Sequence, residues 1–424
     1  MCRRVVYLFL ALVLTLPVRA QENKELEESF LEAEYFLMKE DYTDALSSYL
    51  QLYSKMPENA NLAYCIGLCY LNIPGRKNLS VDYLESATKN MSAKHKEGTL
   101  SQVAAPYDAL FELGKAYRIN FKFDRAKEAF NKYLATLLPD DKENIDFVKH
   151  EIEVCETAKD LISKPVAYTE ENIGELFNDE KNNFNPLISA DGKSFAYMVS
   201  LKFYDAVMYS KLINGKWTAP LNITPELQSD GDFYISCLSS DGKLLFLSRD
   251  DNENSDIYVS TYDGSHWSKT TRLNKNINTK YWESHAFISD DGTQLVFASD
   301  RPGGFGGLDL YVSHKVNGDW GPAVNMGPEI NTEFNEDRPF LINNGKTLFF
   351  SSQGHQNIGG YDLFRSDLQP NGLWSVPKNL GYPINTPDDD IFFMPVGDGK
   401  SGYYSRYKET GGFGKSDIYK IMFK

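Results

Sequence analysis

Three carboxylates occupy one position of a repeated segment, and pairs of carboxylates are the acid and base of most glycosidases. Glu283, Glu336 and Asp390 each lie eight residues before a two-residue turn. A glycosidase, however, needs two carboxylates whose environments give them different pKa values. A residue that is repeated by symmetry more often caps a strand or a loop. We therefore expect a structural role for these carboxylates and no catalytic residue in the chain.

Aromatic and basic side chains lie beside these carboxylates in the sequence. Trp282 and His285 flank Glu283, and Arg338 follows Glu336. Side chains of these types are suited to contact a carbohydrate, a cation or a partner protein. The sequence therefore predicts one set of ligand- or partner-contacting residues: Trp282, Glu283, His285, Glu336, Arg338 and Asp390.

Two other segments resemble binding loops but lack their defining residues. The glycine cluster Gly303–Gly307 has no Lys-Ser/Thr of a phosphate-binding loop and opens no helix, so we assign it to a hairpin loop. The segment Asp250–Asp256 alternates oxygen ligands as calcium loops do, but Thr261 stands where such loops place a glutamate. A weak cation site in this segment stays open.

The cysteines and histidines form no recognisable metal or catalytic motif. Cys65 and Cys69 lie four residues apart on one face of an expected helix, among apolar residues, and are expected in the core. No second pair of cysteines or histidines completes a zinc set, and the chain has neither a HExxH pair nor a GxSxG elbow. We expect no metal and no cofactor.

Evenly spaced tryptophans indicate which elements position these residues. Trp217, Trp267, Trp320 and Trp374 recur about every 50 residues, each after a turn such as Asp191-Gly192. The third strand of each unit contains Asp-Ile-Tyr or a close variant. The four clearest copies begin at Asp256, Asp309, Asp362 and Asp417. A period of this length with several strands per unit predicts a β-propeller with one four-stranded blade per repeat.

The number of strand sets predicts five blades, although only four of them carry a tryptophan. The fifth set ends at the C-terminus, and its missing outer strand is expected from residues 166–173. The segment that follows, Gly174 to Asn178, parallels Gly381 to Asn385 in the fourth repeat. The propeller is thus expected to be closed by an N-terminal strand, which leaves no open sheet edge. The candidate contact set then lies at the entry to the innermost strands, at the mouth of the propeller.

The first half of the chain has helical periodicity. Small and aromatic residues recur at helical spacing over residues 26–57, 62–87 and 106–134, and a helix over 141–163 is expected to cap them. This pattern resembles tetratricopeptide repeats, whose stacked helix pairs form an α-solenoid. Such a stack implies a groove for a peptide or a partner helix; the alternative is that the helices only brace the propeller.

The ends and the charge of the chain bear on where it acts. Arg3 and Arg4 precede a short apolar run that ends near Ala20, which predicts a secretory signal peptide over residues 1–20. Removing it removes Arg3, Arg4 and Arg19 and no acid, so the net charge goes from −15 to −18. A surface this acidic repels nucleic acid. No other segment is long and apolar enough for a transmembrane span in the mature chain.

The residues Ser299 to Tyr311, with their Ser-Asp-Arg-Pro-Gly-Gly sequence, resemble the WD40-like repeat of TolB-type propellers. Together with tetratricopeptide repeats, the chain is similar to a class of Bacteroidota cell-envelope proteins. Some members of that class are tied to type IX secretion, and relatives commonly continue into an OmpA-like domain that grips peptidoglycan. No such domain follows the last blade here, so the wall-anchoring role is not carried over.

We therefore expect three parts: a signal peptide (1–20), a helical domain of the tetratricopeptide type (21–163) and a five-bladed WD40-like propeller (164–424). The resemblance implies an exported, non-enzymatic scaffold in the periplasm or at the outer membrane. Its partners would be other envelope proteins, bound through the helical groove and a propeller face. A glycan or peptidoglycan association stays open, and a glycan-binding or glycan-cleaving propeller is the alternative function.

Overall fold

The computed structural model describes residues 21, 23–250 and 254–424 of the chain. The expected signal peptide lies outside these residues. The chain divides into two compact units, one up to Ile152 and one from Glu153 onward. The division falls inside helix α7 (Lys142–Ile162). In the part of the chain that the structure describes, no helix combines the length and apolarity needed to cross a membrane.

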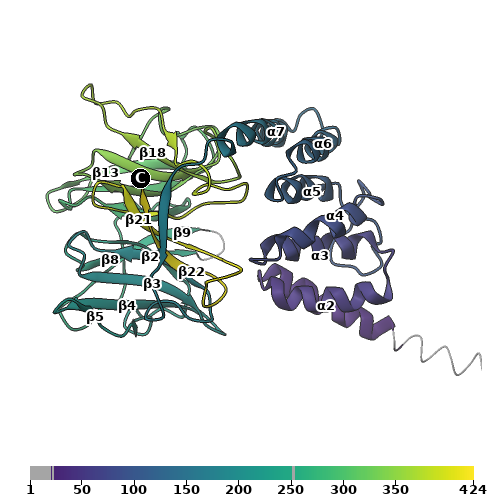
Figure 1. The fold of residues 1–424 in the computed structure, drawn as a ribbon, viewed down its shortest axis with the longest axis horizontal. Helices are drawn as coiled ribbons and strands as arrows, with labels where there is room; N and C mark the ends of the chain where they lie inside the picture. The colour runs from purple at the N-terminus through teal and green to yellow at the C-terminus, as the bar shows by residue number, and fades with distance from the viewer. Residues whose placement is uncertain (1–20, 22, 251–253) are drawn as a thin grey trace, which may run out of the picture. The chain divides into compact units, whose positions relative to one another are not determined.

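The first unit is a succession of helices (Figure 1). A helix over residues 23–38 comes first and precedes α2. The others are α2 (Tyr42–Lys55), α3 (Ala60–Asn72), the short 3₁₀ helix η1 (Lys77–Leu79), α4 (Ser80–Ala87), α5 (Asp108–Ile119), α6 (Phe123–Leu134) and α7. Side chains fix where helices begin: Asn59, for example, accepts a hydrogen bond of 3.0 Å from the Leu62 N–H at the start of α3.

Two glycines let consecutive helices approach closely. A Cβ atom on Gly67 of α3 would lie 2.6 Å from Leu84 of α4, and one on Gly114 of α5 would lie 2.4 Å from the Phe130 ring of α6. Cβ atoms are essentially never found this close to a neighbour, so a larger residue at either position would have to displace Leu84 or Phe130. Cys65 and Cys69 are buried in the core of this unit, as expected, and burial raises the pKa of the Cys69 thiol to about 12.

The second unit is a five-bladed β-propeller. In four blades the chain runs from the innermost strand outward. Blade 1 holds β2 (Asn183–Ile188), β3 (Ser194–Ser200), β4 (Asp205–Ile213), β5 (Lys216–Trp217) and β6 (Leu221–Asn222). Blade 2 holds β7 (Phe233–Leu238), β8 (Leu244–Asp250), β9 (Ser255–Thr261) and β10 (Thr271–Arg272). Blade 3 holds β11 (Glu283–Ile288), β12 (Gln294–Ser299), β13 (Asp309–Val316), β14 (Asp319–Trp320) and β15 (Val324–Asn325). Blade 4 holds β16 (Glu336–Ile342), β17 (Thr347–Ser352), β18 (Asp362–Asp367) and β19 (Lys378–Asn379).

The last blade is closed by the strand that the sequence predicts. It holds β20 (Met394–Val396), β21 (Ser401–Arg406), β22 (Asp417–Phe423) and, as its outer strand, β1 (Tyr168–Asn172). β1 is antiparallel to β22, with Tyr168 opposite Phe423 and Asn172 opposite Tyr419. Val166, Tyr168 and Ile173 pack against the propeller core. Residues far apart in the sequence therefore complete one blade and leave no unpaired inner edge.

The outer strands of blades 1 to 4 are short, and an asparagine side chain forms hydrogen bonds to the third strand that a longer outer strand would form. β6, β10, β15 and β19 have only two residues each. In blade 3, the Asn331 amide accepts a 2.7 Å hydrogen bond from the Leu310 N–H and donates one of 3.0 Å to the Leu310 carbonyl. The same two bonds join Asn278 to Ile257, Asn385 to Leu363 and Asn178 to Ile418. In blade 1, the Thr224 hydroxyl supplies only the acceptor, for the Val207 N–H.

Removing β1 should open the propeller. A chain that begins at residue 165 keeps β1, whereas one that begins at residue 174 lacks it and leaves β22 as an exposed edge. We expect the shorter chain to melt about 10 °C or more below the longer one, because it loses both the backbone pairing and the packing of Tyr168 and Ile173. Calorimetry of the two truncated chains measures this. Equal melting temperatures would refute the closure.

Candidate functional site

The three recurring carboxylates bind the loops that precede their own strands. Glu336 accepts hydrogen bonds of 2.7 Å from the Thr332 N–H, the Thr332 hydroxyl and the Ser352 hydroxyl. Glu283 holds Thr279 in the same way, at 2.6 and 2.7 Å, and also accepts from Ser299 and Arg301. Asp390 accepts from the N–H and hydroxyl of Thr386 at 2.5 and 2.9 Å. One chemical arrangement is thus repeated in blades 3, 4 and 5.

These contacts give the carboxylates a structural task. Glu283 and Glu336 are 0% exposed, whereas Asp390 is half-buried. Burial raises the pKa of Glu336 to about 7, and it does the same for Asp390. A raised pKa is also typical of a general acid, but here each carboxylate is bound by the hydroxyls and N–H of its own blade. The geometry therefore explains these carboxylates as residues that hold the preceding loop in place.

The basic members of the predicted set lie on the innermost strands, where those strands bulge. His285 and Arg338 have φ angles of 49° and 48°, as does Asn185 with 48° at the same blade position. Positive φ is costly for such residues, so the bulge is a fixed local feature. His285 Nδ1 lies 2.8 Å from Asp337 Oδ1. Arg338 donates to the Asn185 side-chain oxygen at 3.4 Å.

The Arg338 contact crosses the propeller axis, because blade 5 separates blade 4 from blade 1 in the ring. The guanidinium of Arg338 also lies 5.8 Å from the centre of the Phe392 ring, and Phe392 stands edge-on to Phe340. Side chains from blades 1, 4 and 5 therefore meet on the axis at this end. The structure brings His285 and Arg338 together through Asp337, and Trp282 pairs instead through its backbone with Asp300.

Electrostatics in this cluster keep Asp337 ionised. Burial, and after it the charge of Arg338, lower the pKa of His285. Burial opposes ionisation of Asp337, but the neighbouring His285 and Arg338 outweigh it and lower the pKa of this carboxyl. Contact of Trp282, His285 or Arg338 with a ligand stays a prediction.

The glycine cluster and the candidate calcium segment are the other two segments that the sequence singled out. In the glycine cluster, the Asp309 carboxylate accepts from the N–H groups of Phe305 and Gly306, which fixes a hairpin loop as expected. Residues 251–253 of the candidate calcium segment lie outside the described residues. Within residues 21, 23–250 and 254–424, no three His, Cys, Asp or Glu side chains are grouped so as to hold a metal ion.

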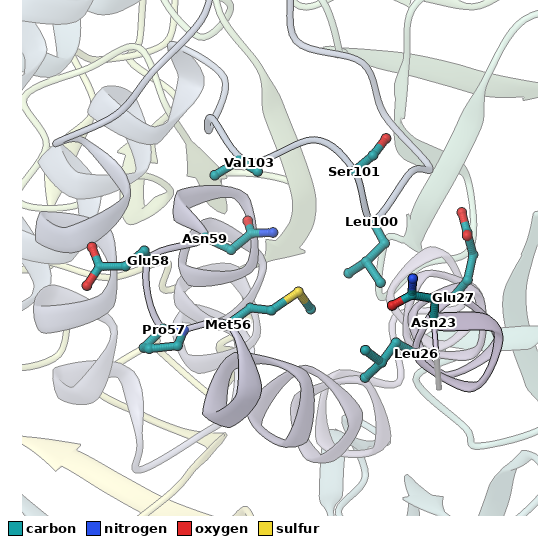
Figure 2. A pocket seen from close by; sticks show the side chains of 10 residues that line it. All are labelled: Asn23, Leu26, Glu27, Met56, Pro57, Glu58, Asn59, Leu100, Ser101 and Val103. Carbon is teal, nitrogen blue, oxygen red and sulfur yellow. The ribbon is translucent and has the colours of Figure 1, made fainter. Parts of the chain in front are cut away.

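The helical unit contains a pocket of about 570 Å³. Its walls come from the start of the first helix, the turn between α2 and α3, and the segment that precedes α5. Figure 2 shows the side chains of Leu26, Met56 and Leu100 pointing toward one another across it. Glu27 and Glu58 add negative charge to its lining, and Val103, which is 47% exposed, forms part of its edge. The pocket combines an apolar interior with an acidic edge.

Sequence reasoning missed the threonine and asparagine partners, although a signal for them is present. The triplet Ile-Asn-Thr occurs at residues 277–279, 330–332 and 384–386, each time four residues before the carboxylate. In this triplet the asparagine binds the third strand and the threonine binds the carboxylate. The pocket of the helical unit had no comparable signal, because it joins segments far apart in the sequence.

A scan against protein-family models gave no match, and neither did a search of curated proteins. Among solved structures, the chain is similar to TolB from Acinetobacter baumannii, with 16% identity and a TM-score of 0.37 over 57% of this chain and 55% of that one. A putative TolB from Agrobacterium tumefaciens matches with 16% identity and a TM-score of 0.38, over 58% and 79% of the two chains.

The catalytic domain of a GH62 α-L-arabinofuranosidase from Coprinopsis cinerea matches at 10% identity and a TM-score of 0.40, over 61% and 98% of the two chains. The chain spans about half the length of the Acinetobacter TolB. Similarity this low carries no argument about function, and the propeller assignment rests on the strand topology itself.

Protonation of Glu336 should stabilise the propeller. Because its pKa in the fold is about 7, against 4.5 for an ordinary glutamate, the folded state binds the proton more tightly. Its contribution to the free energy of unfolding is therefore largest below pH 4.5 and falls by up to about 3 kcal/mol as the pH rises through 7. Glu336→Gln should lose this dependence, because an amide does not titrate. The variant can still fold, since its Oε1 can accept from the Thr332 N–H while its Nε2 faces the two hydroxyls.

Urea unfolding of the wild type and of Glu336→Gln at pH 5 and pH 8 checks this. Glu333→Gln is the matched control, because Glu333 is exposed in the same loop. We expect the control to follow the wild type at both pH values. A Glu336→Gln protein with the same pH dependence as the wild type would contradict the assignment.

Proposed function

We propose that this protein is a non-enzymatic, protein-binding scaffold of the bacterial envelope. The observation that carries the proposal is the pocket of the helical unit, with its apolar interior and acidic edge. A pocket of this size accepts a large apolar side chain and part of the adjoining backbone. The acidic edge favours a partner segment that carries Lys or Arg beside its apolar residue.

The helix packing supports a tetratricopeptide-type module as the source of this pocket. Glycine at residues 67 and 114 brings paired helices into close contact, which is the task of small residues in that repeat. We extend the proposal to the domain limits expected from the sequence, 21–163 for the helical module and 164–424 for the propeller.

The same proposal assigns no catalysis to the propeller. Glu283 and Glu336 would have to release the hydrogen bonds of their own loops before they could act on a substrate. The glycan-cleaving alternative thus lacks an available acid–base pair among the residues that suggested it. Binding of a glycan without cleavage is the remaining form of that alternative.

Export to the periplasm or the periplasmic face of the outer membrane is part of the proposal. It rests on the signal-peptide pattern of residues 1–20, the acidic mature chain and the resemblance to TolB-type envelope proteins. Scaffold proteins of that compartment act by holding other envelope proteins, so the expected partners are proteins of the envelope, including secretion or surface-assembly components.

A photo-crosslinking side chain in the pocket should capture the partner. We expect benzoylphenylalanine in place of Val103 to give a discrete crosslinked species in the source bacterium, because this exposed residue lines the pocket. The additional change Met56→Glu should reduce the yield by about fivefold or more, since it places a charge in the apolar interior.

Leu138 is the matched control position, because it is 68% exposed in the same unit and does not line the pocket. The same probe at Leu138 should not give that species. Identical species from both positions, or none from Val103, would overturn the proposal.

A further inference from the structure

A pocket of about 420 Å³ lies in the propeller between blades 3 and 4, on the side of the inner turns. The side chains of Val312, Leu368 and Trp374 contribute to its lining. Trp374 is one of the four recurring tryptophans, and it bridges to Leu368 through its backbone. This pocket is separate from the axial cluster of His285 and Arg338 and from the pocket of the helical unit.

The junction between blades 1 and 2 shows how the same position is filled elsewhere in the ring. Trp267, the counterpart of Trp374, is only 4% exposed there. The ring of Tyr209 stands edge-on to it at 5.2 Å between ring centres, and the ring of Tyr262 lies 5.2 Å away. The Tyr209 hydroxyl is 3.0 Å from the Ser194 hydroxyl. Two tyrosine rings therefore close this junction over the tryptophan.

The strand register identifies the residues that replace these tyrosines between blades 3 and 4. Tyr209 pairs with Ala196 in blade 1, and Val312 pairs with Val296 in blade 3. Tyr262 bridges to Trp267, and Leu368 bridges to Trp374. Val312 and Leu368 thus stand where the first junction has tyrosines, and both are smaller. Val312 and Leu368 line the pocket, so it lies where the first junction holds the two tyrosine rings.

The polar residues that line the pocket also differ from those of the first junction. Gln294 occupies the position of Ser194, since each lies three residues after the aspartate of its turn. The side chains of Gln294 and Glu329 line the pocket, and within the described residues neither makes a hydrogen bond. They are the free acceptors that a phenol hydroxyl entering the pocket would meet. In the first junction the corresponding hydroxyl is already bound to Ser194.

We propose that the pocket between blades 3 and 4 binds a tyrosine side chain of a partner protein, in the position that Tyr209 fills between blades 1 and 2. The incoming ring packs edge-on against Trp374, and its hydroxyl donates to Gln294 or Glu329. Aromatic pairs of this kind stabilise contacts beyond the area that they bury. The site is independent of the pocket in the helical unit, so either can fail without the other.

N-acetyl-tyrosinamide, titrated into the whole protein labelled with 5-fluorotryptophan, tests the proposal. The fluorine signal of Trp374, assigned with Trp374→Phe, should shift saturably, and N-acetyl-leucinamide should bind about fivefold or more weakly. Val312→Tyr fills the position from within and should abolish the shift. Val316→Tyr, on the same strand but outside the pocket, is the matched control and should leave it unchanged.

Leu368→Tyr is the second blocking variant, in case Val312→Tyr does not fold, and should also abolish binding. Methyl β-glucoside is the probe for a glycan. A Trp374 signal that responds to the glucoside and not to the tyrosine amide would overturn the proposal in favour of glycan binding. An unmoved signal, or a shift that persists in both blocking variants, would overturn it outright.

Discussion

The propeller depends on one repeated interaction, a side-chain amide that binds both the N–H and the carbonyl of a single residue in the third strand. Asn331 does this for Leu310, and three other asparagines do it in their blades. A buried backbone group without a partner costs about 1–3 kcal/mol. In blades 1 to 4 the outer strands have only two residues and cannot satisfy the third strand along its length. The amide supplies the missing pairing and fixes the loop that leads to the next blade.

The same loop carries the threonine that the recurring carboxylate binds. The loop is therefore held at two points, by its asparagine and by its threonine. Asparagine ties the loop to the blade that it leaves, and Glu283, Glu336 or Asp390 ties it to the blade that it enters. The asparagine, which recurs in four blades, and the carboxylate, which recurs in three, thus both have a structural role. Binding is then expected at positions that differ between blades, such as the one held by Tyr209 in blade 1 and by Val312 in blade 3.

The five blades and the closing strand could be predicted from the sequence, because turns, tryptophans and strand sets recur about every 50 residues. The burial of Glu283 and Glu336 could not, since it depends on where Thr279 and Thr332 fold back. The pocket beside Trp374 was hidden for another reason. Only the strand register shows that Val312 and Tyr209 are equivalent, because the spacing between turn and tryptophan differs among the blades.

Hydrogen exchange of five amides tests the central claim, that side chains complete the third strands. The N–H groups of Val207, Ile257, Leu310, Leu363 and Ile418 are bound by side chains and not by an outer strand. We predict that they exchange as slowly as amides between β12 and β13, and that Asn331→Ala speeds exchange at Leu310 by about 100-fold, the equivalent of about 3 kcal/mol. Fast exchange at these five amides in the wild type, at the rate of exposed loop amides, would contradict the account.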